Sequence, residues 1–140
     1  MVKRKKKIGF VCSTFDLLHA GHVLYLEDAK GQCDYLIAGL QIDPTLDRPE
    51  KHKPIQTVLE RFLQLKAVKY VDKIKIYHTE KELYELLKSI KPDIQILGSD
   101  HKGKKFTGDD LKIKRYFHIR NHDWSTTELR RRIKDEHNRL

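Results

Sequence analysis

Apolar and polar positions along the chain follow two alternating patterns, one typical of buried strands and the other of amphipathic helices. Short apolar runs predict strands at 8–12, 34–40, 73–77, 93–97 and 115–120. Apolar residues at helical spacing predict helices at 21–30, 55–68 and 80–90, and a fourth helix is expected to begin at Ser125 or Thr126, with Glu128 completing a capping box. Strands that alternate with helices predict an α/β fold: one doubly wound, Rossmann-like parallel sheet with helices on both faces.

Two segments follow neither pattern and are predicted to be loops. The segment 42–53 contains two prolines and is followed by a third, and the segment 99–110 carries several glycines and lysines. The chain shows no internal repeat and no linker-like composition. We therefore expect one domain over 1–140, with residues 1–6 as a basic tail.

The charge balance points to anionic partners. Lysine and arginine number 29 against 20 aspartates and glutamates, a formal net charge of +9. Apart from runs at 3–7 and 130–132 the positive charge is dispersed, and aromatic residues do not interleave with it as they do on a platform for single-stranded nucleic acid. This pattern argues against nucleic acid as the partner.

The apolar runs and the cysteines indicate a cytoplasmic protein that does not insert into a membrane. No run approaches the roughly 18 apolar residues that a membrane span needs, and the basic start is followed by a strand rather than by an expendable apolar segment. The two cysteines show no C-x-x-C spacing, which suggests reduced thiols.

The most informative stretch is the turn and helix start that follow the first predicted strand. His19 and His22 are three residues apart, about 300° of helical rotation, so their side chains project from nearly the same side of the helix. They lie at the helix N-terminus, where backbone N–H groups and the helix dipole favour an anion. Gly21 removes a side chain where a ligand would approach the backbone. The chain has neither of the two common glycine-rich phosphate loops.

A metal site is the competing interpretation of the two histidines. Zinc would require further cysteine or histidine ligands at short spacing. Cys12 and Cys33 are isolated and the remaining histidines are scattered, so phosphate binding is the stronger hypothesis.

Four segments in order resemble the HxGH nucleotidyltransferases, and most closely glycerol-3-phosphate cytidylyltransferases. The signature is Thr14-Phe15-Asp16-Leu17-Leu18-His19-Ala20-Gly21-His22. Lys53 precedes Arg61 by eight residues, as a phosphate-binding lysine precedes a helix arginine in that family. Leu97-Gly98-Ser99-Asp100 is similar to its G-x-D segment, and Arg120 with Ser125-Thr126-Thr127 is similar to its R-x-x-x-I-S-T-T segment. Residues 15–22 also resemble adenylyltransferases that activate heptose phosphates.

The resemblance implies a role for each matched residue. The catalytic candidates are His19, His22, Lys53 and Arg120. The candidates for nucleotide binding are Thr14, Phe15, Asp16, Gly21, Gly98, Asp100, Ser125, Thr126 and Thr127. Arg61 is expected to hold the acceptor or to pair with a nearby acid. Asp16 and Asp100 are candidate ligands for Mg²⁺, and Asp16 has two alternatives: orienting a histidine, or capping the helix.

The implied reaction is transfer of a cytidylyl group from CTP, with Mg²⁺, to a phosphorylated small alcohol. The expected acceptor is glycerol 3-phosphate, giving CDP-glycerol and pyrophosphate, and the small members of the family suggest a homodimer. An adenylyltransferase that uses ATP on a sugar phosphate or on a cofactor precursor such as FMN is the alternative. A non-catalytic nucleotide sensor and a nucleic-acid-binding module are less favoured, because the phosphate-facing residues form a full set and no nucleic-acid-binding motif is present.

The chain departs from the family pattern at several positions. Ser13 stands where a glycine is common, and His101 stands where the family shows tryptophan after G-x-D. The segment His122-Asp123-Trp124 replaces Glu-Gly-Ile before the Ser-Thr-Thr sequence. These changes bear on the identity of the acceptor and of the nucleobase more than on the type of reaction.

Overall fold

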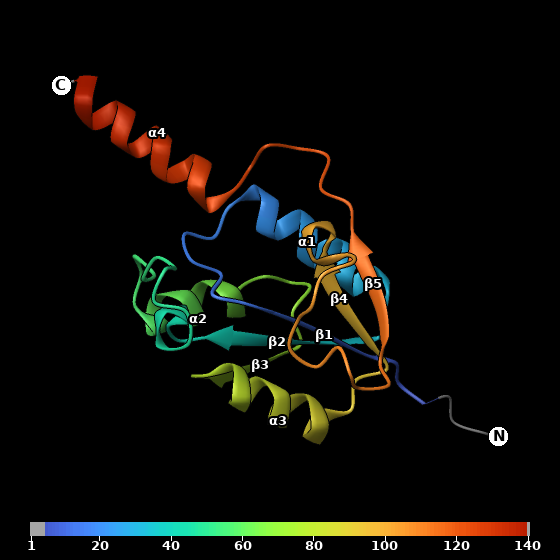
Figure 1. The fold of residues 1–140 in the computed structure, drawn as a ribbon. Helices are drawn as coiled ribbons and strands as arrows, with labels where there is room; N and C mark the ends of the chain where they lie inside the picture. Colours follow the sequence, from blue (N-terminus) through green and yellow to red (C-terminus); the bar gives the residue numbers. More distant parts are fainter. Residues whose placement is uncertain (1–4, 140) are drawn as a thin grey trace.

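The computed structural model describes residues 5–139, so most of the predicted basic tail lies outside the described residues. Five parallel strands form one sheet in the order β3-β2-β1-β4-β5 (Figure 1). The strands are β1 (Ile8–Ser13), β2 (Tyr35–Gln41), β3 (Lys73–Tyr77), β4 (Ile94–Gly98) and β5 (Lys114–His118). The helices are α1 (Ala20–Gly31), α2 (Val58–Lys66), α3 (Glu80–Ile90) and α4 (Thr126–Arg139), with short 3₁₀ turns at Pro44–Leu46 and Ser99–His101. The predicted Rossmann-like architecture is confirmed.

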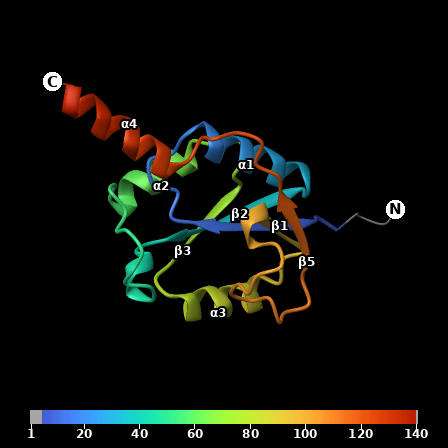
Figure 2. The ribbon, with the colours of Figure 1, turned by 45° about the horizontal axis from the view of Figure 1, so that its top comes forward.

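Helices cover both faces of the sheet, as Figure 2 shows with α1 and α2 on one side and α3 on the other. Successive residues of a strand point to opposite faces. Val11 therefore packs into a core with residues of α1 and α2, while its neighbour Phe10 packs into a core with residues of α3. Helix α4 differs from the other helices because none of its residues is buried, and it projects away from the sheet (Figure 1).

Some helices begin or end at residues other than the predicted ones, because capping hydrogen bonds set their boundaries. The predicted helix 55–68 begins only at Val58, because Thr57 and Glu60 form a reciprocal capping box. Helix α1 includes Gly31 as its last residue. At the start of α4, Ser125 Oγ accepts from the Glu128 amide at 3.0 Å, but the Glu128 carboxylate pairs with arginines of the next turn instead of completing the predicted box.

The strand order places a switch point between β1 and β4. β1 pairs with β2 on one side and with β4 on the other. The strand order therefore runs outward from β1 through β2 to β3 in one direction and through β4 to β5 in the other. In open parallel sheets, ligands bind outside the carboxyl ends of the strands at such a point. Within residues 5–139, no helix combines the length and apolar composition needed to cross a bilayer.

Candidate active site

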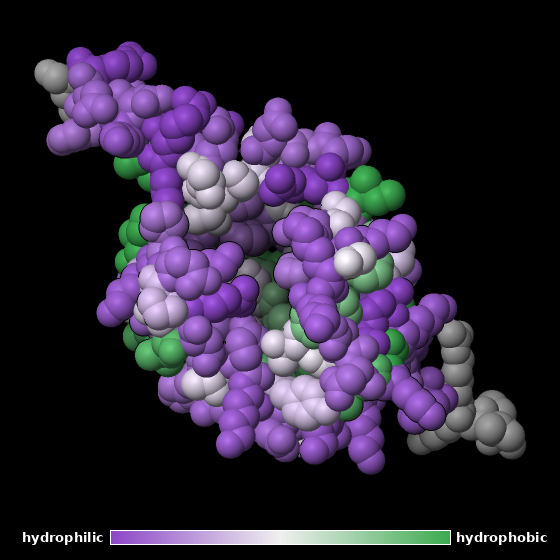
Figure 3. All heavy atoms as spheres, in the orientation of Figure 1, coloured by the Kyte–Doolittle hydropathy of each residue, from purple (hydrophilic) through white to green (hydrophobic). Residues whose placement is uncertain are grey.

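A cleft of about 1230 Å³ lies along the carboxyl ends of the strands. Figure 3 shows a hollow in this face of the molecule, framed mainly by hydrophilic residues. Ten of the predicted site residues line the cleft: Thr14, His19, Gly21, His22, Gly98, Asp100, Arg120, Ser125, Thr126 and Thr127. The other four, Phe15, Asp16, Lys53 and Arg61, do not line it, and each has a different local structure that explains why.

The two motif histidines cap helix α1 with one ring nitrogen each. His19 Nδ1 accepts from the Gly21 amide at 3.0 Å, and His22 Nδ1 accepts from the His19 amide at 3.2 Å. The rings stack with centroids 3.9 Å apart. In a neutral imidazole, the nitrogen that does not accept carries the proton. Both histidines therefore present an Nε2–H donor at the positive end of a helix whose first turn contains no acidic residue.

Burial keeps these imidazoles neutral. It lowers the pKa of His22 to about 3, and the neighbouring His19 adds to this effect while Asp16 opposes it. Burial also lowers the pKa of His19, helped by the nearby His122 and Arg120. In the free protein the donors are therefore neutral N–H groups.

The turn before α1 is held in an unusual backbone conformation by Asp16. Phe15 and Leu17 have positive φ angles of 48° and 51°, in the left-handed region that side chains rarely adopt. The buried Asp16 carboxylate lies between them and accepts from the amides of Ile55 at 2.8 Å and Gln56 at 3.0 Å. It also pairs with Arg130 of α4 at 3.2 Å. Asp16 thus joins the turn to the segment before α2 and to α4.

These contacts correct two predictions for the turn. Asp16 Oδ2 accepts from the Ile55 amide and from Arg130 and Oδ1 accepts from the Gln56 amide, so the carboxylate holds the turn instead of orienting a histidine ring through a hydrogen bond. Phe15 is 1% exposed and packs in the core, and its amide donates to Ser13 Oγ at 3.3 Å rather than facing the cleft.

Arg61 is also a structural residue, which contradicts the prediction that it binds the acceptor. Its side chain is 2% exposed, and its guanidinium donates to four backbone carbonyls. The carbonyls belong to Thr14 at 3.1 Å, Gln41 at 2.5 Å, Ile42 at 2.7 Å and Gln56 at 3.2 Å. The residue therefore fixes the ends of β1 and β2 relative to α2, and it has no path to a ligand in the cleft.

In the loop before α2, Lys51 lines the cleft, whereas Lys53, the predicted phosphate-binding lysine, does not. Lys53 is 78% exposed on its side chain, lies outside the cleft, and has its Nζ 3.9 Å from Asp43 Oδ2. Lys51 lines the cleft together with His52 and Arg48. The position of Lys51 thus suits the phosphate counter-charge better than that of Lys53.

The start of α4 lies beside the N-terminus of α1 on the cleft. Thr126 Oγ1 donates to the Asp16 carbonyl at 3.2 Å and lies 3.4 Å from His19 Nε2. Arg120 lies in the exposed loop that follows β5, two residues beyond the last residue of that strand, and lines the cleft. The histidine pair, Arg120 and the first turn of α4 are therefore brought together from three separate parts of the chain.

Three buried polar atoms have no hydrogen-bond partner within residues 5–139, and the side chains of all three line this cleft. They are Gln41 Nε2, His118 Nε2 and His122 Nε2. Buried polar groups are ordinarily paired, so these atoms indicate where a ligand or solvent completes the site. Sequence reasoning missed Gln41 and His118, although both end strands at the ligand-binding edge of the sheet. His118 is held by a 2.7 Å contact between its Nδ1 and Asp28 Oδ2.

The described side chains do not form a metal cage. No group of three or more His, Cys, Asp or Glu residues within 5–139 is arranged to hold a metal ion. Asp16 is buried and accepts three hydrogen bonds from protein groups, and Asp100 is exposed on the turn after β4. Binding of Mg²⁺ with the help of either residue stays a prediction.

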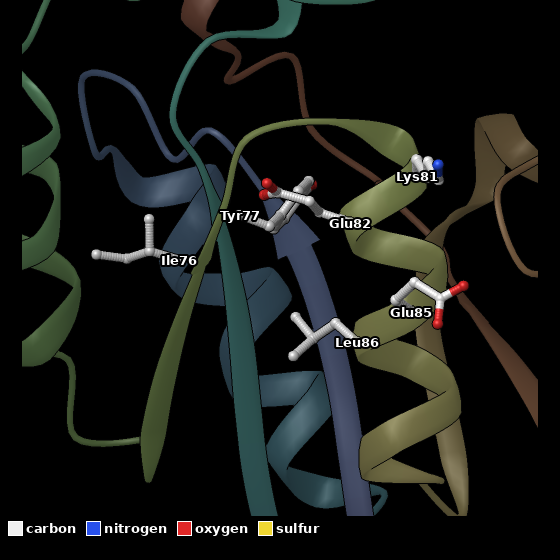
Figure 4. Close-up of a pocket in the computed structure, with 6 residues that line it drawn as sticks. All are labelled: Ile76, Tyr77, Lys81, Glu82, Glu85 and Leu86. Carbon is white, nitrogen blue, oxygen red and sulfur yellow. The ribbon is translucent and has the colours of Figure 1, made fainter.

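A second, smaller hollow of about 380 Å³ lies outside the cleft, between β3 and α3. Figure 4 shows its lining: Ile76, Tyr77, Lys81, Glu82, Glu85 and Leu86. It contains none of the predicted site residues, and we assign it no role.

Comparisons with known sequences identify a family. A profile described as cytidylyltransferase-like matches residues 10–132. The bifunctional protein HldE of a Nitratiruptor species is 41% identical over 110 residues, covering 78% of this chain and 24% of that protein. The HldE of Campylobacter concisus is 38% identical over 141 residues, covering 97% of this chain and 29% of that protein. The chain thus spans less than a third of the length of these relatives.

Solved structures share the fold at low sequence identity. The lipopolysaccharide core biosynthesis protein from Thermoplasma volcanium superposes with a TM-score of 0.67 at 24% identity, over 86% of this chain and all of that one. A pantoate-beta-alanine ligase from Francisella tularensis gives a TM-score of 0.62 at 20% identity, over 95% of this chain and 71% of that one.

Proposed function

Because the chain belongs to the cytidylyltransferase-like family of nucleotidyltransferases, we propose that it transfers a nucleotidyl group from a nucleoside triphosphate to a phosphorylated acceptor. The observation that carries the proposal is the double capping of α1. One ring nitrogen of each motif histidine accepts from an amide at the helix start, which leaves the Nε2–H groups as the donors of two residues that line the cleft; that of His19 lies 3.4 Å from Thr126 Oγ1.

The proposed chemistry needs no general base. An oxygen of the acceptor phosphate attacks the α-phosphorus, a new P–O bond forms, and the bond between the α-phosphorus and the bridging oxygen breaks to release pyrophosphate. A phosphate monoester is largely dianionic near neutral pH because its second pKa is about 6. The demand on the protein is to bring anions together and to neutralise the charge that moves onto the leaving group.

The residues on the cleft suit that demand. The Nε2–H groups of His19 and His22 would donate to phosphate oxygens, and the charges of Arg120 and Lys51 would offset the triphosphate. The amides at the start of α4 add a second anion-binding helix terminus. Mg²⁺ would enter with the triphosphate, and we assign no step to it.

We propose ATP and a sugar phosphate as the substrates, in place of CTP and glycerol 3-phosphate. Residues 15–22 resemble adenylyltransferases that activate heptose phosphates, and the relatives described above are HldE proteins. CTP with glycerol 3-phosphate is the second candidate, favoured by Arg120, which precedes Ser125 by the cytidylyltransferase spacing and lines the cleft with it.

Pyrophosphate release over a matrix of substrates tests the proposal. The four nucleoside triphosphates are each combined with a heptose phosphate, glycerol 3-phosphate or FMN, and products are identified by mass. We expect the highest rate with ATP and the heptose phosphate. A highest rate with CTP and glycerol 3-phosphate would select the second candidate, and no release with any pair would reject nucleotidyl transfer to these acceptors.

A further inference from the structure

His122 belongs to the one segment in which this chain departs most from the family pattern, and its ring has a fixed orientation. Its Nδ1 accepts from the Trp124 amide at 3.1 Å. Its ring stacks on the Trp124 indole with centroids 4.9 Å apart and an interplanar angle of 30°. Because Nδ1 is the acceptor, the proton of the neutral ring lies on Nε2.

The Nε2–H of His122 lacks a protein acceptor. The atom is buried, lines the cleft, and has no hydrogen-bond partner within residues 5–139. A buried donor without a partner costs free energy, which a ligand acceptor in the cleft would recover.

The position of the ring identifies the kind of acceptor. A Cβ placed on Gly21 would lie 2.9 Å from His19 Cε1 and 3.0 Å from His122 Cε1, so both imidazoles approach the first turn of α1 at this glycine. The absence of a side chain at Gly21 thus makes room for the loop that carries His122, rather than for a ligand alone. At this helix terminus the favoured partner of an N–H donor is an anionic oxygen.

We infer that His122 is a third imidazole donor to the substrate phosphates, beside His19 and His22, and that Trp124 positions it. The inference rests on the proposed function for the identity of the substrate. Where the family pattern has a glutamate, this chain therefore presents an imidazole donor next to the two motif histidines.

Binding of inorganic tripolyphosphate, measured by calorimetry, tests the inference without requiring turnover. His122→Asn keeps an acceptor near the Nδ1 position and removes the Nε2–H, whereas His122→Gln places an amide N–H near the Nε2 position. A hydrogen bond to a charged group contributes about 1.5–3 kcal/mol, so we expect His122→Asn to weaken binding about 10- to 100-fold and His122→Gln to retain most of it. His78→Asn is the matched control, because His78 is exposed and lies outside the cleft.

A second measurement distinguishes binding of His122 to the triphosphate from binding to the acceptor phosphate. The KM for the acceptor is measured in the same variants with the best substrate pair found. A loss confined to tripolyphosphate places His122 on the triphosphate, and a loss confined to the acceptor KM places it on the acceptor phosphate. Normal tripolyphosphate binding and normal acceptor KM in a folded His122→Asn would overturn the inference.

The single tryptophan of the chain gives an independent readout. Because Trp124 stacks on His122, we expect tripolyphosphate to change its fluorescence in the wild type and in His78→Asn. If tripolyphosphate binds through His122 but no substrate pair releases pyrophosphate, the proposed function fails while the inference stands.

Discussion

His19 and His22 use their two ring nitrogens for different purposes, and this division explains why histidine is needed at both positions. Nδ1 satisfies a backbone amide of the helix start, and Nε2–H remains for the ligand. A residue that only capped the helix would supply no donor, and lysine would supply a donor without a cap. The stability of α1 and the chemistry of the site are therefore coupled through the same side chains.

Substitution of His19 by asparagine is predicted to separate these two roles. Asparagine is a favourable N-cap residue but has no group at the Nε2 position. We expect His19→Asn to unfold in urea at nearly the wild-type midpoint, while His19→Ala loses about 1 kcal/mol of stability. Turnover should fall about 10²- to 10³-fold in both variants, since each lacks one donor to the transition state. Wild-type turnover in His19→Asn would exclude a catalytic Nε2.

The lowered pKa of His22 predicts a stability that falls with acid. The folded protein holds this ring neutral down to a pH of about 3, whereas the unfolded chain protonates it near its ordinary pKa of 6.5. The unfolded state therefore binds the extra proton first, and the free energy of unfolding should decrease as the pH falls from about 6.5 toward 3. Urea unfolding at several pH values in this window checks the sign.

A variant isolates the contribution of that ring. His22→Gln keeps a side-chain acceptor for the helix cap and removes the titrating group. We expect its free energy of unfolding to change less between about pH 6.5 and 4.5 than that of the wild type. Equal pH dependence in the two proteins would show that other groups, and not His22, determine the acid sensitivity.

At the scale of elements, the loop between β2 and α2 determines which lysine faces the substrate. Lys51 lines the cleft, whereas Lys53 extends toward Asp43 and its carbonyl oxygen lies 3.4 Å from the Arg130 guanidinium. We predict that Lys51→Ala lowers kcat/KM for the triphosphate about tenfold or more, and that Lys53→Ala has a smaller effect. If Lys53→Ala is the more damaging variant, the loop rearranges on binding and the sequence-based assignment is right.

The same loop is predicted to act as a lid. Residues 46–53 are exposed in the structure, and the backbone hydrogen bonds given by their amides, from Leu46, Arg48 and Lys51, lie within local turns, so we expect little protection from exchange in the free protein. Hydrogen exchange with and without nucleotide and magnesium tests whether the loop closes on the triphosphate and excludes water before transfer. Protection of 45–53 that appears only with nucleotide supports closure, and equal exchange in both states reduces the segment to a connector.

Elements were predictable from the sequence wherever periodicity alone decides them, as for the five strands and the helices on both faces. The pairing of the motif histidines was predicted on the assumption that both lie on the helix, but His19 is the N-cap with an extended backbone (φ −137°, ψ 178°), and the reciprocal cap brings its ring onto that of His22. The role of Arg61 was not predictable, since three of the four carbonyls that its guanidinium contacts come from segments 19 or more residues away and meet it only in the folded chain. Asp16 was misjudged for the same reason: its partners lie 39 or more residues away.

Over the whole molecule, exposed apolar side chains on and just before α2 favour the predicted homodimer. Leu59 and Leu63 lie four residues apart on α2 and are 62% and 57% exposed, and Ile55, in the segment before the helix, is 59% exposed. We predict that the wild type sediments as a dimer and that Leu59→Asp shifts it toward monomer, as measured by analytical ultracentrifugation. A monomeric wild type would contradict the prediction, and a dimeric Leu59→Asp would place the interface elsewhere.

The distribution of charge over the whole molecule predicts which anions it binds. Cationic side chains from separate parts of the chain meet on the cleft, namely Arg48, Lys51, Lys105, Arg120 and Arg130, while the other basic residues, apart from the runs at 3–7 and 130–132, are dispersed along the sequence. A compact polyanion such as a nucleoside triphosphate can contact several of these charges at once, whereas a single-stranded nucleic acid needs aromatic residues interleaved with the basic ones, which the sequence does not show.

We therefore expect triphosphate affinity to fall several-fold as NaCl rises from about 50 to about 500 mM, because salt screens exposed charges. Random single-stranded oligonucleotides should bind weakly throughout that range. Tight, salt-dependent oligonucleotide binding without pyrophosphate release would instead assign the charge to nucleic acid, since a site built for one triphosphate gives no advantage to a longer chain.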